Sequence, residues 1–503
     1  MIRERHQEYK SGIVLVAGSA LLAALTAYEP QLAVAASLLM IGILVAAYLV
    51  CRPWHLFALY LFLLAAHVPL MGILLVQVGL PAPVVKAISA WKELTLLLFL
   101  LVALWHLLQS RWRATIPDLL ILFYIFYTLA YLCFSLFESS NSLVTLLYGL
   151  RDLILPFLLY MVGRSISLSD KRAHRVFQWL LWAAFIYSLI GIIEWSFIPT
   201  QWHADLGIAR YYKELLNLEY RPYYLGLPEN YWRGTAAGRL RRAASVYGSS
   251  QSFATSFLLL LPVSIYGMLT RTLKERHLAT LTFIISMIGL VLTITRFTIV
   301  ICVGLLILAS LISSQRARRW ARQSLIVMTV AFILALFLSN SFRVVVISTL
   351  TFEDHSSSTR LVIWADTARI IMRQPLGYGI GQVGHTVARL IEERAQVVGI
   401  EGQMSKIGVE LGILGLLLYL SILVVISAYL FITYNRVKEP YIRALCFASA
   451  LTFIGLLVNS LTTEWHNSIA LVYPAWWLAG SCVRVGSQYK KIDSSTQIQR
   501  NEN

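Results

Sequence analysis

Charged side chains are scarce in this sequence. They account for 13% of its 503 residues, whereas 58% are apolar. A soluble chain would carry about a quarter charged residues. This shortage excludes an ordinary soluble fold.

Motifs for nucleotides, metals and disulfides are also lacking. No Walker-type phosphate loop is present, so we expect no direct use of ATP. The five cysteines form no Cys-x-x-Cys pair and the histidines do not cluster at ligand spacing, which argues against a disulfide framework or a zinc site. Gly377–Gly381 follows no strand, so we interpret it as a turn near the membrane surface. We expect no metal and no cofactor.

Long apolar runs are abundant instead. A helix that crosses the hydrocarbon core needs roughly 20 mostly apolar residues, and these runs do not alternate as barrel strands do. They are too numerous and too long for one cleavable signal peptide. The sequence therefore predicts an all-α polytopic integral membrane protein with about fourteen transmembrane helices and two large extracytoplasmic loops. The expected spans are 12–28, 31–50, 54–79, 92–109, 116–136, 143–163, 175–197, 249–269, 278–294, 297–313, 322–340, 404–432, 441–461 and 467–483.

Two of these boundaries are special. The run 54–79 is long enough to be broken at Pro69, and two spans meet at Thr295-Arg296 with barely a loop between them. The expected organisation is 1–197 for the N-terminal helices, 198–248 for one loop, 249–340 for the central helices, 341–403 for a larger loop with an amphipathic helix, 404–486 for the C-terminal helices and 487–503 for a cytoplasmic tail.

Lysine and arginine orient the chain. They gather in alternate loops, for example at Arg316, Arg318, Arg319 and Arg322, and are nearly absent from the short loops between. This is the positive-inside pattern, and it predicts that both termini are cytoplasmic. The net charge of +17 then needs no nucleic-acid partner, since topology and anionic lipid head groups explain it.

Arginines on the outer side are the main candidates for function, because the positive-inside bias disfavours them there. Arg239, Arg241 and Arg242 come directly before the span 249–269, where they could bind phosphate or only anchor the chain at the interface. Arg296 lies at membrane depth, where a charge usually has a function, with snorkelling to the interface as the alternative.

Other candidates lie on both sides of these arginines. Arg151 and Asp152 are expected to open the span 143–163, where a local ion pair explains them as well as a shared basic cavity does. Arg360 and Trp364 lie four residues apart on an expected interfacial helix, which would look the same without any catalytic duty.

Two carboxylates complete the set of candidates. Glu401 is exposed enough to titrate and could act as a general base beside an arginine cavity. Glu410 lies inside the next span and could simply pair with a basic neighbour.

The order of these residues resembles the O-antigen ligase and O-antigen polymerase superfamily. The resemblance covers roughly residues 239–430. Its motifs are Arg242-x-x-Ser245-x-Tyr247-Gly248, Thr295-Arg296, Arg360-x-x-x-Trp364 followed by Pro375-Leu376-Gly377-Tyr378-Gly379, and Glu410-Leu411-Gly412 ahead of Gly415. One position departs, because the ligases have a histidine nine residues before that glutamate and this chain has Glu401. With the number of spans, this resembles the polymerase branch more than the lipid A-core ligase.

The resemblance implies glycan transfer on the outer face of a bacterial inner membrane. The donor would be an undecaprenyl-diphosphate-linked oligosaccharide, the acceptor another lipid-linked repeat unit, and the product an O-antigen, capsule or exopolysaccharide. Arg242 and Arg296 would neutralise the leaving group, and Glu401 would act as the base. A flippase and a chain-length regulator are the implied partners. The implied substrate-binding residues are Arg239, Arg241, Arg151, Arg360, Trp364 and Tyr247.

Four alternatives stay open. The chain could be a ligase that transfers glycan to a lipid or a protein, or a transporter of lipid-linked sugars. A transporter should show charges near the midplane and paired half-helices, whereas this sequence places its charges at the outer surface. A non-catalytic scaffold would tolerate substitution of the outer arginines. A peptidoglycan polymerase of the shape, elongation and division class should show motifs that are not seen here.

Overall fold

The computed structural model describes residues 52–109, 114–138, 142–235, 238–270, 274–312, 355–384 and 400–501, with isolated positions between 323 and 347. The chain divides into two compact units, Met1–Leu56 and Phe57–Asn503. The second unit contains nearly all of the described residues. The spans expected at 12–28, 31–50 and 322–340 lie outside the described residues.

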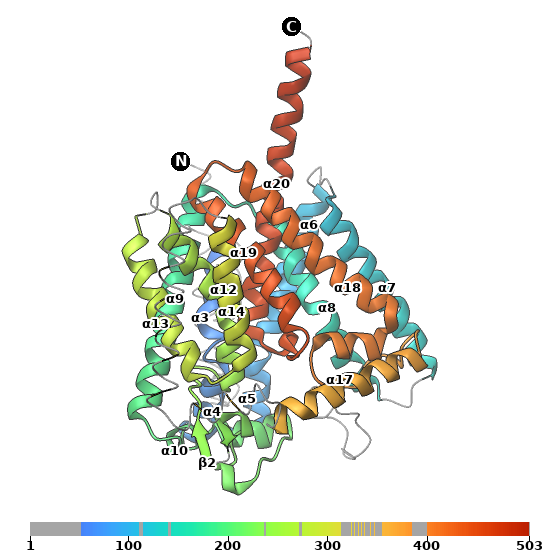
Figure 1. Ribbon diagram of the computed structural model, residues 1–503. Helices are drawn as coiled ribbons and strands as arrows, with labels where there is room; N and C mark the ends of the chain where they lie inside the picture. Colours follow the sequence, from blue (N-terminus) through green and yellow to red (C-terminus); the bar gives the residue numbers. More distant parts are fainter. Residues whose placement is uncertain are drawn as a thin grey trace, which may run out of the picture. The chain divides into compact units, whose positions relative to one another are not determined.

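Helices make up almost all of the second unit, and most of them run roughly side by side (Figure 1). Those before the first long loop are α3 (Pro53–Leu63), α4 (His67–Val76), α5 (Ala82–Ser89), α6 (Trp91–Gln109), α7 (Ile116–Glu138), α8 (Leu143–Ser165) and α9 (Asp170–Phe197). Those after it are α12 (Ser250–Leu269), α13 (Arg276–Leu292), α14 (Arg296–Ile312), α17 (His355–Arg373), α18 (Gln403–Arg436), α19 (Pro440–Asn459) and α20 (Ile469–Asn501).

The segment between α9 and α12 contains short elements. It holds a two-stranded antiparallel hairpin that the sequence did not predict. The elements are α10 (Gln201–Asp205), α11 (Ile208–Arg210), the π-helical turn η1 (Tyr211–Leu215), the 3₁₀ turns η2 (Pro222–Tyr224) and η3 (Glu229–Tyr231), and the strands β1 (Trp232–Thr235) and β2 (Gly238–Arg241). One further 3₁₀ turn, η6 (Trp465–Asn467), joins α19 to α20.

Eight of the described helical segments are long and apolar enough to cross a membrane, or nine if α3 and α4 count as one bent span. α5 and α6 together form one of the eight, and α13 and α14 are shorter apolar helices of 17 residues each. The structure thus confirms an all-α multi-pass membrane protein. The total of about fourteen spans stays a prediction.

The run 54–79 is broken, as expected, but not at Pro69. α3 and α4 are bent by 69°, and the bend falls at Leu64–Ala66, before Pro69. Pro69 lies in the first turn of α4, where backbone N–H groups have no partner inside the helix, so its missing N–H costs little.

α8 and α20 pack with their backbones in close contact. A Cβ atom on Gly163 would lie 2.0 Å from the carbonyl oxygen of Trp477, and one on Gly480 would lie 2.1 Å from that of Tyr160. Small residues at a crossing allow this approach between membrane helices. Close by, the buried Arg164 donates from Nε to Asp118 Oδ1 at 3.0 Å, so the charge inside the bundle is paired.

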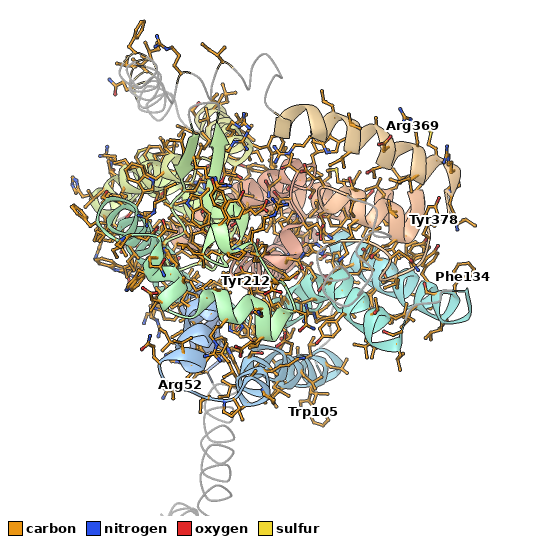
Figure 2. The ribbon with its side chains drawn as sticks, turned by 90° about the horizontal axis from the view of Figure 1, so that it is seen from below. Arg52, Trp105, Phe134, Tyr212, Arg369 and Tyr378 are labelled. Carbon is orange, nitrogen blue, oxygen red and sulfur yellow. The ribbon has the colours of Figure 1, made fainter. Side chains whose placement is uncertain are left out.

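The hairpin, α10 and α17 lie at one end of the bundle, opposite the C-terminal end of α20 (Figure 1). We call this the hairpin end. Figure 2 shows it face-on, with α17 along one edge, Tyr212 near the middle and Phe134 on α7 at the periphery. The longest non-helical segments of the described residues meet at this end, and such segments often carry function.

Candidate functional site

The arginines of the hairpin lie on its two opposite faces. Arg233 pairs with Leu240 across the ladder, and the ladder continues one step further because Arg242 donates its backbone N–H to Tyr231 O at 3.0 Å. Side chains alternate along a strand. Arg233 and Arg242 therefore share one face, and Arg239 and Arg241 share the other.

Arg242 reaches the turn between α13 and α14. Its Nε donates to Thr293 O at 2.7 Å and its second terminal nitrogen to Thr295 Oγ1 at 2.7 Å. Ala243 N also donates to Leu292 O at 2.9 Å. Arg296, the first residue of α14, follows directly. The structure thus brings together Arg242 and the Thr295-Arg296 turn, which lie about fifty residues apart in the sequence.

The electrostatic surroundings of Arg242 are unfavourable for a cation. Burial, with the nearby charges of Arg233 and Arg360, lowers the pKa of Arg242 to about 10. Its two hydrogen-bond acceptors are neutral oxygens. A half-buried guanidinium among other guanidinium groups would be stabilised by an anion.

Glu401 lies at the edge of this group. Arg360 on α17 donates from Nε to Glu401 Oε2 at 2.7 Å, and each side chain is about one-third exposed, at 32% and 33%. One turn along α17, Trp364 donates from Nε1 to Leu461 O at 3.0 Å, which ties the helix to the turn after α19. The arginine cluster therefore consists of Arg233, Arg242 and Arg360, next to the Thr295-Arg296 turn and to Glu401.

A buried carboxylate holds the segment that carries Arg242. Glu194, near the end of α9, accepts from Ala244 N at 3.0 Å and from Ser245 N at 3.2 Å. It also accepts from Arg241 at 2.6 Å and contacts His203 Nε2 at 3.0 Å. Ser245 has a φ of 54°, a left-handed conformation that such bonds can hold in place.

The glycine-rich segment 375–384 packs against α18 near Glu410. Gly381 N lies 3.2 Å from Glu410 Oε1, and Tyr378 N donates to Val409 O at 2.8 Å. α18 is interrupted at Gly412, which has φ 72° and ψ −170°, and Ile413 N donates to Pro375 O there at 2.9 Å. Glu410 therefore binds the backbone of this segment. The segment is a docked turn, as the sequence indicated.

Residues 281–420 match a family described as O-antigen ligase. The resemblance found in the sequence is therefore confirmed. The matched segment of the O-antigen ligase type contains Arg296, Arg360, Glu401 and Glu410, whereas Arg242 lies before it. The site is thus built partly from the matched segment and partly from the preceding loop. No curated protein matches the chain.

Three of the expected substrate-binding residues lie apart from the arginine cluster. Arg239 lies over the rings of Tyr223 and Tyr224, at 3.4 and 4.4 Å from their centroids. Arg241 is neutralised by Glu194. Tyr247 is 3% exposed and stacks on Phe253, which gives it a packing role beside the O-antigen ligase segment.

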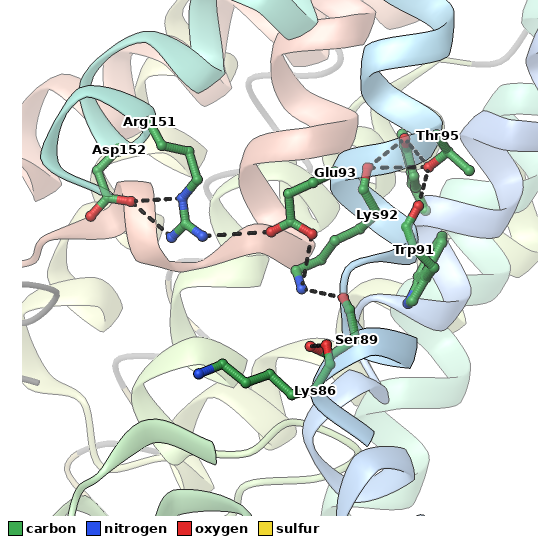
Figure 3. Close-up of polar contacts among 9 residues, drawn as sticks. Lys86, Ser89, Trp91, Lys92, Glu93, Thr95, Arg151 and Asp152 are labelled. Carbon is green, nitrogen blue, oxygen red and sulfur yellow. Dashed lines mark hydrogen bonds and ion pairs between the residues drawn. The ribbon is translucent and has the colours of Figure 1, made fainter. Parts of the chain in front are cut away.

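Arg151 also departs from expectation. It does not open its helix, because α8 begins at Leu143, about two turns earlier. Its guanidinium contacts Asp152 Oδ1 at 3.0 Å and lies 3.6 Å from Glu93 Oε1 on α6 (Figure 3). In the described part of the chain, no hydrogen bond or ion pair joins Arg151 to Arg242.

The sequence alone did not single out several polar groups near the site. Arg233 was not recognised as a candidate because the hairpin that carries it was not predicted. His466 is 5% exposed and contacts Asp152 O at 2.8 Å through Nδ1, and burial lowers its pKa to about 3, so the imidazole is neutral. Lys92 and Glu93 could have been recognised from the sequence, since they are a charged pair at the start of an apolar run.

Within the described ranges, no group of three or more His, Cys, Asp or Glu could hold a metal ion.

Proposed function

We propose that this protein is a membrane glycosyltransferase that polymerises undecaprenyl-diphosphate-linked oligosaccharide repeat units into a surface polysaccharide. The reaction would take place at the hairpin end, on the extracytoplasmic face of a bacterial inner membrane. The match to the O-antigen ligase family supports this reaction class. The main structural support is Arg242, a cation placed among cations and bonded, within the described residues, only to neutral oxygens.

The diphosphate of the donor lipid fits the arginine cluster. Guanidinium groups bind phosphate oxygens in bidentate pairs and keep their charge when partly buried. Bond cleavage leaves the electron pair on the lipid diphosphate, and Arg242 with Arg296 would stabilise that developing charge. Electrostatic stabilisation of this kind usually contributes more to the rate of an enzyme than any other single effect.

The acceptor would be activated by Glu401. A hydroxyl oxygen of the acceptor sugar attacks C1 of the donor sugar, the bond from C1 to the phosphate oxygen breaks, and the hydroxyl proton passes to Glu401. In the structure Arg360 binds this carboxylate. An incoming diphosphate competes for Arg360, so donor binding would release Glu401 for its role as base.

A ligase is the second candidate, because the matching family is described by that activity. It would transfer a whole glycan once to a different acceptor lipid or protein. Glu401 at the position of the ligase histidine favours the polymerase. The same assay separates the two, since a ligase adds one glycan per acceptor and a polymerase gives a ladder.

The test is a reconstituted assay with protein in nanodiscs, a lipid-diphosphate-linked oligosaccharide and EDTA, without ATP. Wild type should give a ladder on a gel, and Arg242→Ala, Arg296→Ala and Glu401→Gln should abolish it. Arg210→Ala is the matched control, since Arg210 is 52% exposed in the same loop and bound to Glu214. A ladder of normal length from the Arg242 and Arg296 variants would overturn the proposal.

A further inference from the structure

A second group of cations comes from three helices and is not used by the proposed transfer step. It consists of Lys86 on α5, Lys92 on α6 and Arg151 on α8, and we call it the second basic cluster. Figure 3 shows the side chain of Lys86 extending below the pair formed by Glu93 and Arg151. Lys92 and Arg151 thus approach Glu93 from two helices, and Lys86 extends from a third helix nearby.

The carboxylates of this region are shared. Glu93 lies 3.3 Å from Lys92 Nζ and 3.6 Å from Arg151. Asp152 lies 3.0 Å from Arg151 and 3.3 Å from Lys406 Nζ. Each carboxylate is therefore shared between Arg151 and a lysine, so neither serves Arg151 exclusively.

Two donors of the cluster are accessible. The side chain of Arg151 is 37% exposed, and its contact to Glu93 at 3.6 Å is longer than a hydrogen bond. Lys86 is exposed, and no ion pair joins it to another described residue. An anion could accept from both without breaking the bonds between Arg151 and Asp152.

The second basic cluster is linked to the start of α18. Lys406 in the first turn of this helix contacts Asp152, and Gln403 contacts His466, which in turn contacts Asp152 O. Glu401 lies two residues before Gln403 and faces Arg360. Glu401 itself therefore contacts Arg360, and the residues that follow it contact the helix turn that carries Arg151.

Along α6, the residues that follow Lys92 form an apolar surface on one side of the helix. Leu94, Leu97 and Leu101 are 63%, 56% and 59% exposed and lie on one side of the helix. An anionic head group at Lys86 and Arg151 would place its hydrocarbon chain along these leucines. A lipid with a charged head therefore fits better than a free phosphate.

We propose that Lys86 and Arg151, with Lys92 beside them, form the site for the diphosphate of the acceptor lipid, apart from the donor diphosphate at Arg242. This rests on the proposed polymerase, because only a polymerase joins two substrates that both carry a lipid diphosphate. The acceptor reacts at the far end of its oligosaccharide, so its diphosphate needs a site of its own. Without such a site, the two head groups would compete for one cluster.

The experiment compares two acceptors in zwitterionic nanodiscs with one unlabelled lipid-diphosphate donor. Both acceptors carry the same fluorescent repeat unit, one on a lipid diphosphate and one on an uncharged alkyl chain. Wild type should show an apparent KM roughly tenfold lower for the diphosphate acceptor, the effect of one or two charge-assisted hydrogen bonds. Lys86→Gln and Arg151→Gln should remove this difference and leave the donor KM and the KM of the neutral acceptor unchanged.

Lys213→Gln is the matched control, because Lys213 is 63% exposed at the same end and paired with Glu219. Equal KM values for both acceptors in wild type would overturn the proposal, as would variants that raise both KM values equally. Retention of phosphatidylglycerol that depends on Lys86, together with equal KM values, would assign the cluster to membrane lipid instead. Failure of the polymerase itself looks different, since wild type would then form no bond with either acceptor.

Discussion

In the proposed mechanism, the contact between Glu401 and Arg360 couples donor binding to activation of the acceptor. The hydrogen bond of 2.7 Å occupies Oε2 of the carboxylate and leaves Oε1 for a second partner. A general base must reach the proton that it removes, and an ion pair at rest keeps such a group oriented. Both side chains are partly exposed, so a substrate anion can reach the pair.

We expect Glu401→Gln to lower kcat by roughly 10²–10⁴-fold, the usual contribution of a general base. The amide oxygen can still accept from Arg360, so the fold and the donor KM should change little. The measurement is a single-turnover rate with saturating donor. Asp366→Asn makes the same chemical change in the exposed pair between Asp366 and Arg369 and should have no effect. A Glu401→Gln rate within threefold of wild type would remove Glu401 from the mechanism.

At the scale of elements, the interruption of α18 at Gly412 allows the segment 375–384 to pack against this helix. Gly412 has φ 72° and ψ −170°, a conformation that is essentially restricted to glycine. A Cβ atom there would lie 2.2 Å from the carbonyl oxygen of Pro375. The segment also bonds Glu410 and ends at Gly384, where a Cβ would lie 2.9 Å from Glu464. The break therefore positions this segment beside the start of α18.

Gly412→Ala should lower Tm by several degrees and reduce activity, because left-handed strain alone costs about 1–3 kcal/mol before the clash with Pro375 is counted. The readout is thermal unfolding in detergent. Gly304→Ala is the control, since Gly304 lies within α14 and a Cβ there meets nothing within 4 Å. That variant should be neutral or stabilised, as alanine favours a helix by roughly 0.5–1 kcal/mol. Equal Tm values for both variants would contradict the role of Gly412.

Local sequence patterns predicted much of the site. The parts that they missed depend on contacts between residues far apart in the sequence. Thr295-Arg296 was recognised as a turn because two apolar runs meet there. The alternation of the hairpin, which separates Arg233 and Arg242 from Arg239 and Arg241, required the pairing of β1 with β2. Glu194 was hidden within an apolar run, and its partners Ala244 and Ser245 lie about fifty residues away.

At the scale of the whole molecule, hydropathy predicted a multi-pass helical protein because lipid leaves few options for the backbone. It predicted a break in the run 54–79 at Pro69, whereas the bend falls at Leu64–Ala66, because the position of a break depends on packing as well as on proline. Orientation rests on the distribution of lysine and arginine, which predicts that the hairpin end lies outside the cytoplasm.

Orientation can be tested with single cysteines in a background without the five native ones. Lys213→Cys at the hairpin end should react with a membrane-impermeant maleimide in spheroplasts. Lys274→Cys, exposed directly before α13, should react only after the membrane is permeabilised. The reverse pattern would invert the topology and place the arginine cluster on the cytoplasmic side.

The central claim is that the arginine cluster stabilises a diphosphate leaving group, and donors with different leaving groups test it most directly. One donor carries the oligosaccharide on a lipid diphosphate and the other on a lipid monophosphate, with one neutral acceptor for both. Wild type should prefer the diphosphate donor in kcat/KM by roughly 10²-fold or more, as expected when a group that stabilises the transition state is engaged. Arg242→Gln should remove most of this preference by slowing only the diphosphate donor. An unchanged preference in Arg242→Gln, with the protein folded, would contradict the account.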